Sequence, residues 1–351
     1  MNALVERDLV DLDRLGEWMQ AQGLPAGAFE NQRLLTGGTQ NTLLYFERGG
    51  RPFVLRRPPK HLRANSNKVM LREARILRAL AGSGVPHPGY IAHCEDESVL
   101  GAVFFLMEPV EGFNPSTGLP ELHRSDVTMR RRMSQCHMEA LASLGMLDYV
   151  SLGLKDFGKP EGFLQRQPGR WRSELEGFSR LEGYGDSKLP FEREIHTWLE
   201  NNIPAETTPG IIHGDCHMAN TMFNNGDGEL AALIDWEMST IGDPLLDLGW
   251  VMATTDDGDG FNTTNITSAD GFLSIAEMVA HYGKHSSRDL SSLQWYAVLA
   301  CYKLGVILEG THARACAGKA DKAVGDQLHQ FTLSLFNRAH RWIEQGIPTA
   351  I

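Results

Sequence analysis

Three oxygen-bearing side chains between residues 211 and 237 have types and spacing that suit phosphoryl transfer. Asp215 is followed five positions later by Asn220, and Asp235 comes after a further short apolar run. Transfer of a phosphoryl group from ATP needs a carboxylate beside the attacking hydroxyl, and it needs oxygen ligands for Mg²⁺. Asp215 fits the first requirement, and Asn220 and Asp235 fit the second.

The elements around these residues can bring them together. The apolar pair 211–212 precedes the loop that carries Asp215 and Asn220, and residues 230–234 have the pattern of a buried strand that ends at Asp235. The alternative is that the loop is only a tight turn and that Asp235 only caps a helix. Because all three residues and the apolar runs occur together, the phosphate site is favoured over this alternative.

Length, composition and charge exclude several classes of protein. The chain has 351 residues, of which 42% are hydrophobic and 22% are charged, so one large or two coupled globular domains are expected. The formal net charge of -11 argues against nucleic acid or an anionic membrane as the main partner. No apolar run is long enough for a membrane span. Neither a nucleic acid nor a membrane is therefore expected as the main partner.

The cysteines indicate a reducing, cytoplasmic location. There are five of them, and they are widely spaced, which is not the pattern of a disulfide framework. Cys216 and His217 lie inside the catalytic segment and raise the question of a zinc site. Neither has a partner at a metal-ligand spacing, so zinc is disfavoured there. The charged N-terminus also lacks the apolar core of a signal peptide.

The pattern of elements predicts an α+β protein with two lobes. Residues 1–110 are expected to form an N-terminal lobe with an N-terminal helix, an antiparallel sheet and one further helix. Residues 111–351 are expected to form a larger, mainly helical lobe that carries the catalytic loop and the acceptor site. The expected strands and helices have the following ranges: a hairpin at 34–46, strands at 51–57 and 103–107, and helices at 66–80, 129–147, 192–201 and 294–316.

A carboxylate on the helix at 66–80 points to a second part of the site. Glu73 lies on the apolar stripe of this helix, and a buried carboxylate is costly without a cationic partner. Arg56 or Arg57 on the preceding strand can supply one, as a strand lysine does for a helix glutamate in kinases. The alternative is a glutamate at the rim of the stripe that pairs with Arg72 or Arg75.

A glycine pair in the first hairpin is a weaker signal. Backbone N–H groups at Gly37 and Gly38, together with Thr39, can approach phosphate oxygens. An ordinary β-turn explains the same residues equally well. The pattern is not that of a GxGxxG loop.

These segments together resemble the aminoglycoside phosphotransferase and choline kinase-like superfamily, which has a protein-kinase-like fold. The resemblance covers roughly residues 30–315 and rests on the HGDxxxxN segment at 213–220 and the IDWE segment at 234–237. The most similar subgroup is the kinase-like domain associated with some acyl-CoA dehydrogenases. The segments that indicate this subgroup are 53–59, 72–74, Arg166-Gln167, Arg170-Trp171, 242–244 and 247–250.

The resemblance implies a role for each of the residues that match its motifs. Asp215 is implied to be the catalytic base, Asn220 and Asp235 to ligate Mg²⁺, and His213 to hold the catalytic loop by hydrogen bonding. Asp243 is expected to cap the helix that follows it. The residues implied to bind ATP are Arg56 and Glu73, the glycine turn at Gly37, Gly38 and Thr39, and a hinge made by Met107, Glu108 and Val110.

Arg56 is a departure from most members of the superfamily, which have lysine at this strand position. Arginine keeps the charge and can pair bidentately with Glu73 or phosphate, but it is bulkier. Alternation along the strand puts Arg56 and Arg57 on opposite faces, so only one of them can point into the cleft. Arg56 is the expected one because Arg57 directly precedes Pro58.

The acceptor is less defined by the sequence. The superfamily suggests an aminoglycoside or choline, whereas the subgroup suggests a hydroxy acid or a hydroxyacyl-CoA. Basic residues for an anionic acceptor are available at Arg166, Arg170 and Arg172 and at 130–132, although each run also suits a solvated helix face. Trp236 and Glu237 directly follow Asp235 and are expected to contact the acceptor, or to pack. Lys303 interrupts an apolar helix and either pairs with a carboxylate or reaches the acceptor.

Two functions remain at this point. The first is an ATP- and Mg²⁺-dependent kinase that phosphorylates a hydroxyl of a small molecule. The second is a nucleotide-binding pseudokinase with a scaffolding role, for which the replacement of lysine by Arg56 is the one supporting feature. The presence of Asp215, Asn220 and Asp235 together favours the kinase, because a scaffold needs none of them.

Overall fold

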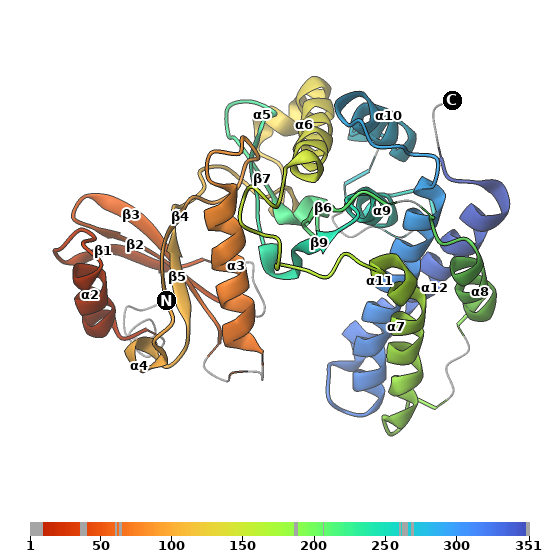
Figure 1. Ribbon diagram of the computed structural model, residues 1–351, viewed down its shortest axis with the longest axis horizontal. Coiled ribbons are helices and arrows are strands. Elements are labelled where there is room, and N and C mark those ends of the chain that lie inside the picture. The colour runs from red at the N-terminus through yellow and green to blue at the C-terminus, as the bar shows by residue number, and fades with distance from the viewer. Residues whose placement is uncertain are drawn as a thin grey trace.

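The computed structural model describes residues 10–35, 41–59, 62, 65–185, 189–205, 207–259, 261, 266–267 and 270–348. The predicted turn residues Gly37, Gly38 and Thr39 lie outside these described residues. The fold is α+β and has two lobes, with a sheet in the N-terminal lobe and helices in the C-terminal lobe (Figure 1). This agrees with the predicted fold class.

The N-terminal lobe is built on a five-stranded antiparallel sheet with the strand order β1-β2-β3-β5-β4. β1 pairs antiparallel with β2, and β2 forms a hairpin with β3 through the turn at Gly49-Gly50. The lobe also contains α2, α3 and α4. The bounds are β1 (Phe29–Leu34), β2 (Thr42–Arg48), β3 (Arg51–Arg57), β4 (Tyr90–Cys94), β5 (Phe104–Met107), α2 (Leu12–Ala21), α3 (Ser66–Leu80) and α4 (Glu97–Leu100).

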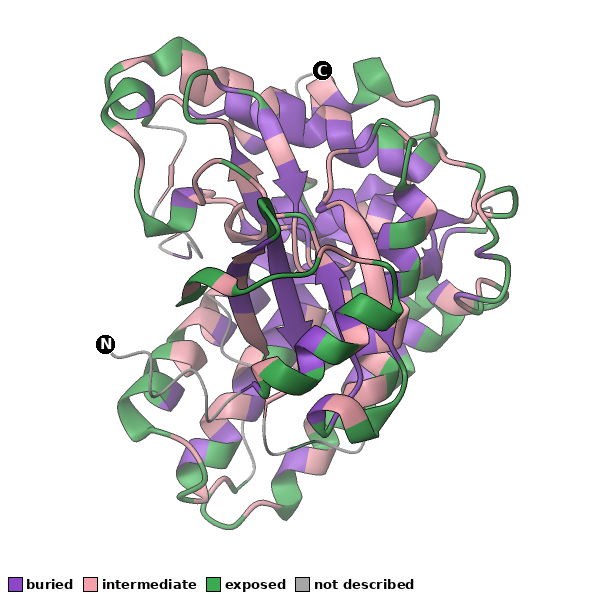
Figure 2. Cartoon of the chain, turned by 90° about the vertical axis from the view of Figure 1, so that its left-hand side faces the viewer, coloured by how far each residue is buried: buried purple, intermediate pink, exposed green. Residues whose placement is uncertain are grey.

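The two faces of this sheet bury different sets of side chains. Phe53 and Leu55 of β3 pack into a cluster with residues of α2 and α4, whereas Phe105 of β5 joins the cluster that includes α3 and the C-terminal lobe. Arg56 is paired in register with Phe105. Because side chains alternate along a strand, Arg56 is directed toward α3 and the C-terminal lobe. Figure 2 shows the buried residues gathered along the central strands.

The C-terminal lobe consists of helices around two small antiparallel ribbons, β6 with β9 and β7 with β8. Residues 108–113 connect β5 to this lobe, where Phe113 forms an isolated bridge with Phe223. The bounds are α5 (Glu121–Ser125), α6 (Val127–Met146), α7 (Phe163–Gly177), α8 (Glu192–Asn201), β6 (Gly210–Ile212), β7 (Thr221–Phe223), β8 (Leu230–Leu233), β9 (Thr240–Gly242), α9 (Leu245–Thr254), α10 (Ile275–His285), α11 (Leu293–Cys316) and α12 (Lys322–Gln345).

Helix α3 joins the two lobes, and Figure 1 shows it between the sheet and the helical part. Its buried face includes Glu73, Ile76 and Leu77, so Glu73 lies on the apolar stripe as predicted. On the exposed side of α3, Arg75 contacts the C-terminal lobe by pairing with Asp156. Among the described residues, no helix combines the length and the apolar character needed to cross a membrane.

Candidate active site

The catalytic loop is held by a buried carboxylate at the start of α9. Asp247 is 3% exposed and accepts hydrogen bonds from the backbone N–H groups of His213 (2.6 Å) and Gly214 (2.8 Å). Burial raises the pKa of Asp247, while His213 and the two N–H groups act in the opposite direction. The thiol of Cys216 donates to the Asp247 carbonyl oxygen. One aspartate therefore fixes the backbone on which Asp215 stands.

We expect Asp247→Ala to destabilise the protein by about 3 kcal/mol, since it leaves two buried N–H groups unpaired at about 1–3 kcal/mol each. Asp247→Asn, which keeps one acceptor oxygen, should lose less. Urea unfolding monitored by circular dichroism measures both changes. An alanine variant within about 0.5 kcal/mol of the wild type, the usual range for a surface substitution, would show that Asp247 does not hold the loop.

His213 ties the catalytic loop to the strand that leads to Asp235. Its ring is fully buried, with Nε2 3.0 Å from the Ile234 carbonyl oxygen, and Nδ1 accepts the N–H of Asp215 at 3.3 Å. These partners fit a neutral ring protonated at Nε2. Burial also lowers the pKa of His213. The geometry therefore matches the holding role implied for this residue.

Asp215 and Asn220 are side by side, as predicted. The Asn220 amide donates to the Asp215 carbonyl oxygen (2.8 Å) and to its carboxylate (2.9 Å). The other carboxylate oxygen of Asp215 accepts the indole N–H of Trp250 at 3.0 Å. With its nitrogen on Asp215, Asn220 can present its side-chain oxygen to a cation. The donor set near Asp215 therefore fits Mg²⁺.

Asp235 follows β8 and has a left-handed backbone conformation, with φ of 65° and ψ of 65°. Such a conformation is uncommon for a residue other than glycine, and it often marks a functional site. The N–H of Ile234 donates to the Asn220 carbonyl oxygen at 2.9 Å, so the two segments with predicted metal ligands lie next to each other. Asp235 thus adds a third oxygen-bearing side chain at the same place.

Arg56 connects Glu73 to the end of β8. Its Nε lies 2.8 Å from Glu73 Oε2, and its Nη2 lies 2.7 Å from Asp235 Oδ1 and 3.8 Å from Glu237 Oε2. The alternative partners for Glu73 are engaged elsewhere, since Arg75 binds Asp156 and Arg72 binds backbone carbonyls. The structure therefore contains the Arg56–Glu73 pair that the sequence suggested.

Burial raises the pKa of Glu73 to about 7 from 4.5, and it outweighs the opposite effect of Arg56. Between these pH values Glu73 is protonated in the folded protein and ionised in the unfolded chain, so stability falls as the pH rises. We expect the wild type to lose on the order of 3 kcal/mol relative to Glu73→Gln across this range. Urea unfolding at several pH values measures the difference, with the exposed Glu30→Gln as a control. Parallel curves for wild type and Glu73→Gln would contradict the raised pKa.

The predicted hinge residues lie where β5 leaves the sheet. Glu108 donates its N–H to the Gly89 carbonyl oxygen at 2.7 Å, and its carboxylate pairs with Arg51 at 3.0 Å. The Glu108 side chain is therefore directed to the sheet, and an adenine would meet backbone groups around Met107 and Val110. Asn41, which directly precedes β2, donates its side-chain N–H to the Glu237 carboxylate at 3.4 Å.

A cavity of ≈ 300 Å³ opens beside the catalytic loop. Trp171 and Trp250 form apolar walls, and Arg72, Arg170 and Lys303 contribute cationic groups. Lys303 Nζ lies 4.2 Å from the centre of the Trp250 ring and 3.4 Å from the Gly214 carbonyl oxygen. Burial lowers the pKa of Lys303, whereas the nearby Asp215 acts in the opposite direction. Lys303 therefore reaches the site.

Two of the predicted acceptor residues, Trp236 and Arg166, do not line this cavity. Trp236 is 1% exposed, packs against the tilted ring of His213 and donates its N–H to the Leu233 carbonyl oxygen, so the structure favours the packing alternative for it. Arg166 is exposed and donates to the carbonyl oxygens of Lys159 and Glu161, away from the cavity lining. Glu237 and Arg170 do line the cavity.

The other basic runs form ordinary contacts at the surface. Arg131 pairs with Glu277, Arg132 pairs with Glu139 and Glu229, and Arg172 pairs with Glu176, which supports the alternative of solvated helix faces.

Asp243 Oδ1 accepts the N–H of Leu245, which confirms its expected capping role at α9.

Trp250 is the residue of the site that sequence reasoning missed. It lies three positions after Asp247 on α9, so both side chains face the catalytic loop. The aspartate-to-tryptophan spacing at 247–250 was visible in the sequence, but only the structure shows that the indole bonds to Asp215. Trp171 also lines the cavity, although it lies far from Asp235 in the sequence.

Comparison with known proteins agrees with this geometry. Residues 31–284 match the model of the family described as the phosphotransferase enzyme family. The chain is 29% identical over 332 residues to chicken acyl-CoA dehydrogenase family member 11, a match that covers 91% of this chain and 41% of that protein. The chain thus spans less than half of this relative, whose whole activity cannot be transferred to it.

Solved structures show the same fold. An aminoglycoside phosphotransferase-like protein of Ralstonia eutropha superposes with a TM-score of 0.78 at 27% identity, covering 95% of this chain and 99% of that one. The ternary complex of the aminoglycoside phosphotransferase APH(4)-Ia with ADP and hygromycin B superposes with a TM-score of 0.57 at 14% identity, covering 93% and 97%. The predicted family resemblance is confirmed, and this chain belongs to the phosphotransferase enzyme family.

Proposed function

We propose that this protein transfers the γ-phosphoryl group of ATP, in the presence of Mg²⁺, to a hydroxyl of a small anionic molecule. A hydroxy acid or its CoA thioester fits this description. The observation that carries the acceptor class is the excess of cationic side chains in the cavity beside Asp215. The proposed donor chemistry rests on Asp215, Asn220 and Asp235, which lie close together.

On the donor side, Asn220 and Asp235 would hold Mg²⁺, which neutralises charge on the transferred phosphoryl group. Arg56, positioned by Glu73, would contact the phosphates. Asp215 would accept the proton of the attacking hydroxyl, and Trp250 fixes the rotamer of its carboxylate. ADP bound in the APH(4)-Ia complex supports the nucleotide assignment by analogy of fold.

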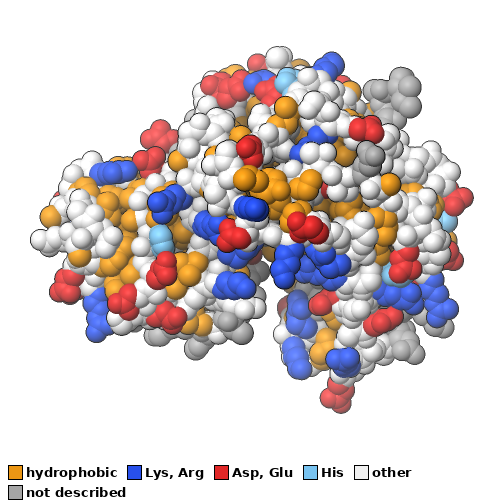
Figure 3. Space-filling model, in the orientation of Figure 1, with side chains coloured by type: hydrophobic (Ala, Val, Ile, Leu, Met, Phe, Trp, Pro, Cys, Tyr) orange, Lys and Arg blue, Asp and Glu red, His pale blue; other side chains and the backbone are white. Residues whose placement is uncertain are grey.

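On the acceptor side, Arg72, Arg170 and Lys303 form no ion pair with any carboxylate in the part of the chain that the structure describes. Arg72 bonds to two backbone carbonyls, Arg170 lies over the Trp171 ring, and Lys303 lies over Trp250. Figure 3 shows Lys and Arg side chains gathered where the two lobes meet. A bound anion would neutralise the positive charges of Arg72, Arg170 and Lys303.

The same charges argue against a cationic acceptor. An aminoglycoside or choline would need carboxylates, and both cavity carboxylates are engaged: Asp247 holds the catalytic loop, and Glu237 lies near Arg56 and Asn41. The similarity to part of an acyl-CoA dehydrogenase family member is consistent with an acyl-CoA acceptor. A polycation therefore fits this cavity poorly.

Acceptor panels test the proposal. The protein is incubated with ATP, Mg²⁺ and hydroxy acids, hydroxyacyl-CoAs, choline or kanamycin, and ADP formation is measured. We expect turnover with anionic acceptors only, and a rise in KM for Lys303→Gln and Arg170→Gln but not for the exposed Lys319→Gln. Preferred turnover of choline or kanamycin would contradict the acceptor class. Absence of any turnover would favour the pseudokinase.

A further inference from the structure

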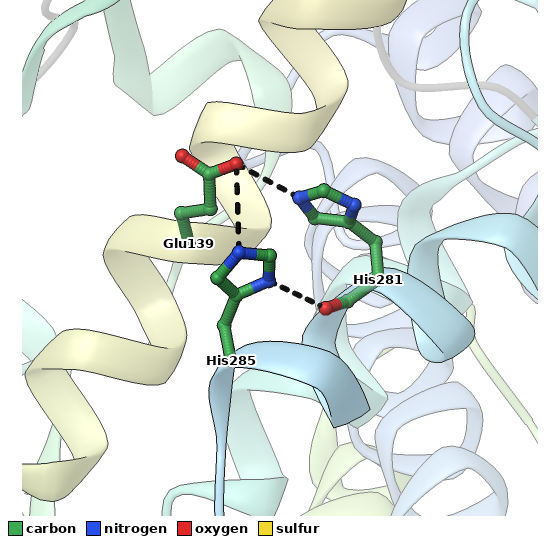
Figure 4. A group of neighbouring side chains, drawn as sticks. All are labelled: Glu139, His281 and His285. Carbon is green, nitrogen blue, oxygen red and sulfur yellow. Dashed lines mark hydrogen bonds and ion pairs between the residues drawn. The ribbon is translucent and has the colours of Figure 1, made fainter.

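A Glu-His-His cluster outside the active site has the ligand types of a transition-metal site. Glu139 lies on α6, and His281 and His285 lie four positions apart on the facing helix α10. Their ligand atoms all lie within 4.8 Å of one another. Figure 4 shows the carboxylate and both rings directed into the space between the two helices.

The distances between the ligand atoms are close to what a metal needs. Glu139 Oε1 is 2.9 Å from His281 Nε2 and 4.0 Å from His285 Nε2. Ligand atoms of a tetrahedral Zn²⁺ with bonds of about 2.0–2.1 Å lie roughly 3.3 Å apart. Small side-chain rotations therefore suffice, and His281 and His285 are 17% and 42% exposed, so both rings have room to make them.

An independent contact fixes the tautomer of one histidine. His285 Nδ1 lies 2.9 Å from the backbone carbonyl oxygen of His281, so Nδ1 carries the proton. The lone pair on Nε2 is then directed toward Glu139. A hydrogen bond from the second ring nitrogen to a carbonyl is the usual way in which a metal-binding histidine is oriented.

Arg132 is the cation that competes for this carboxylate. Its Nη1 lies 2.6 Å from Glu139 Oε1, while its Nε and Nη2 hold both carboxylate oxygens of Glu229 at 2.6 and 2.8 Å. Arg132 therefore keeps a bidentate partner when Glu139 turns toward a metal. Arg132 contacts the same oxygen of Glu139 that faces both histidines, so metal binding requires Arg132 to release Oε1.

We propose that Glu139, His281 and His285 form a Zn²⁺ site that clamps α6 to α10. Two imidazoles and one carboxylate suit zinc, whereas Mg²⁺ prefers oxygen ligands such as those of the proposed catalytic site. Water completes the coordination. The site is distinct from the catalytic centre, because none of its three residues lines the acceptor cavity. The ion therefore has a structural role.

Calorimetry on a chain without a polyhistidine tag tests the site. After chelator treatment, the protein is titrated with ZnCl₂ in excess Mg²⁺. We expect His285→Ala and Glu139→Gln to weaken zinc binding by at least about tenfold, the lower end of what loss of even an outer-sphere partner costs a metal site. Zinc should raise the melting temperature of the wild type but not of His285→Ala. Circular dichroism checks that the variants fold.

The chain offers a matched control in a second cluster, formed by Glu309, His312 and His329. His312→Ala should bind zinc at this α6–α10 site as the wild type does. Zinc binding that is unchanged in His285→Ala, or lost in His312→Ala, would overturn the proposal. Failure of the wild type to bind zinc would show that Glu139 and His281 form only a hydrogen-bonded pair.

Discussion

Replacing Asp215 by alanine should lower kcat by about 10²–10⁴-fold, the contribution of a positioned general base. The variant removes the carboxylate that Trp250 and Asn220 orient. It leaves Arg56, Glu73 and Asp235 in place, so we expect the affinity for MgATP to stay within about threefold of the wild type, or within roughly 0.7 kcal/mol. Steady-state kinetics and calorimetry with a non-hydrolysable ATP analogue measure the two quantities.

The control for this experiment is Asp13→Ala, which removes an exposed aspartate from the first turn of α2. It should keep the full kcat. Wild-type turnover in Asp215→Ala would show that another group accepts the hydroxyl proton. A loss of nucleotide affinity as large as the loss of kcat would show that Asp215 acts in binding instead.

Asp235→Asn should have the second large effect, of about 10²-fold or more in kcat, because the Mg²⁺ that we propose Asp235 holds would supply several kcal/mol of charge stabilisation in the transition state. In contrast to Asp215→Ala, this variant should also need much more Mg²⁺ for half-maximal activity. Titration of activity with Mg²⁺ at saturating ATP separates the two variants.

The matched control is Asp126→Asn at the N-terminus of α6, where Asn caps as well as Asp. It has the same change of charge and should leave the Mg²⁺ dependence unaltered. An Asp235→Asn variant with the Mg²⁺ dependence of the wild type would remove Asp235 from the metal site. In that case its contact with Arg56 would be its main interaction.

Arg56 links these predictions to the sequence. A strand alternates its side chains, so the sequence could place Arg56 and Arg57 on opposite faces, and the Arg56–Glu73 pair is present. The contact of Arg56 with Asp235 could not be foreseen, because it depends on how the two lobes meet. Arg56 contacts both Glu73 and Asp235, which lie far apart in the chain, only because the tertiary fold brings them together.

Local patterns predicted several elements well, and long-range packing decided the rest. β3, α3 and α8 have the predicted bounds, since periodicity and turn residues specify them locally. α7 was not predicted as a helix, and it contains Pro168, a residue that usually ends helices. The boundary between the lobes at residue 110 stays a prediction.

The acceptor cavity shows the same limit. The catalytic loop is a contiguous motif and could be identified from the sequence. The cavity is lined by residues of α3, α7, α9 and α11 and by the segments at 212–214 and 237–240, so spacing along the chain could not decide between the two alternatives for Lys303. Burial of Trp236 likewise depends on its contact with His213, which brings two separate segments together.

The most direct test of the central claim is to follow an isotope-labelled γ-phosphoryl group from ATP. The wild type and Asp215→Ala are incubated with labelled ATP, Mg²⁺ and a hydroxyacyl-CoA, and the products are analysed by mass spectrometry. We predict that the label appears on the acyl hydroxyl with the wild type and not with the variant. Label found only in free phosphate, or equally on the acceptor with both proteins, would contradict the account.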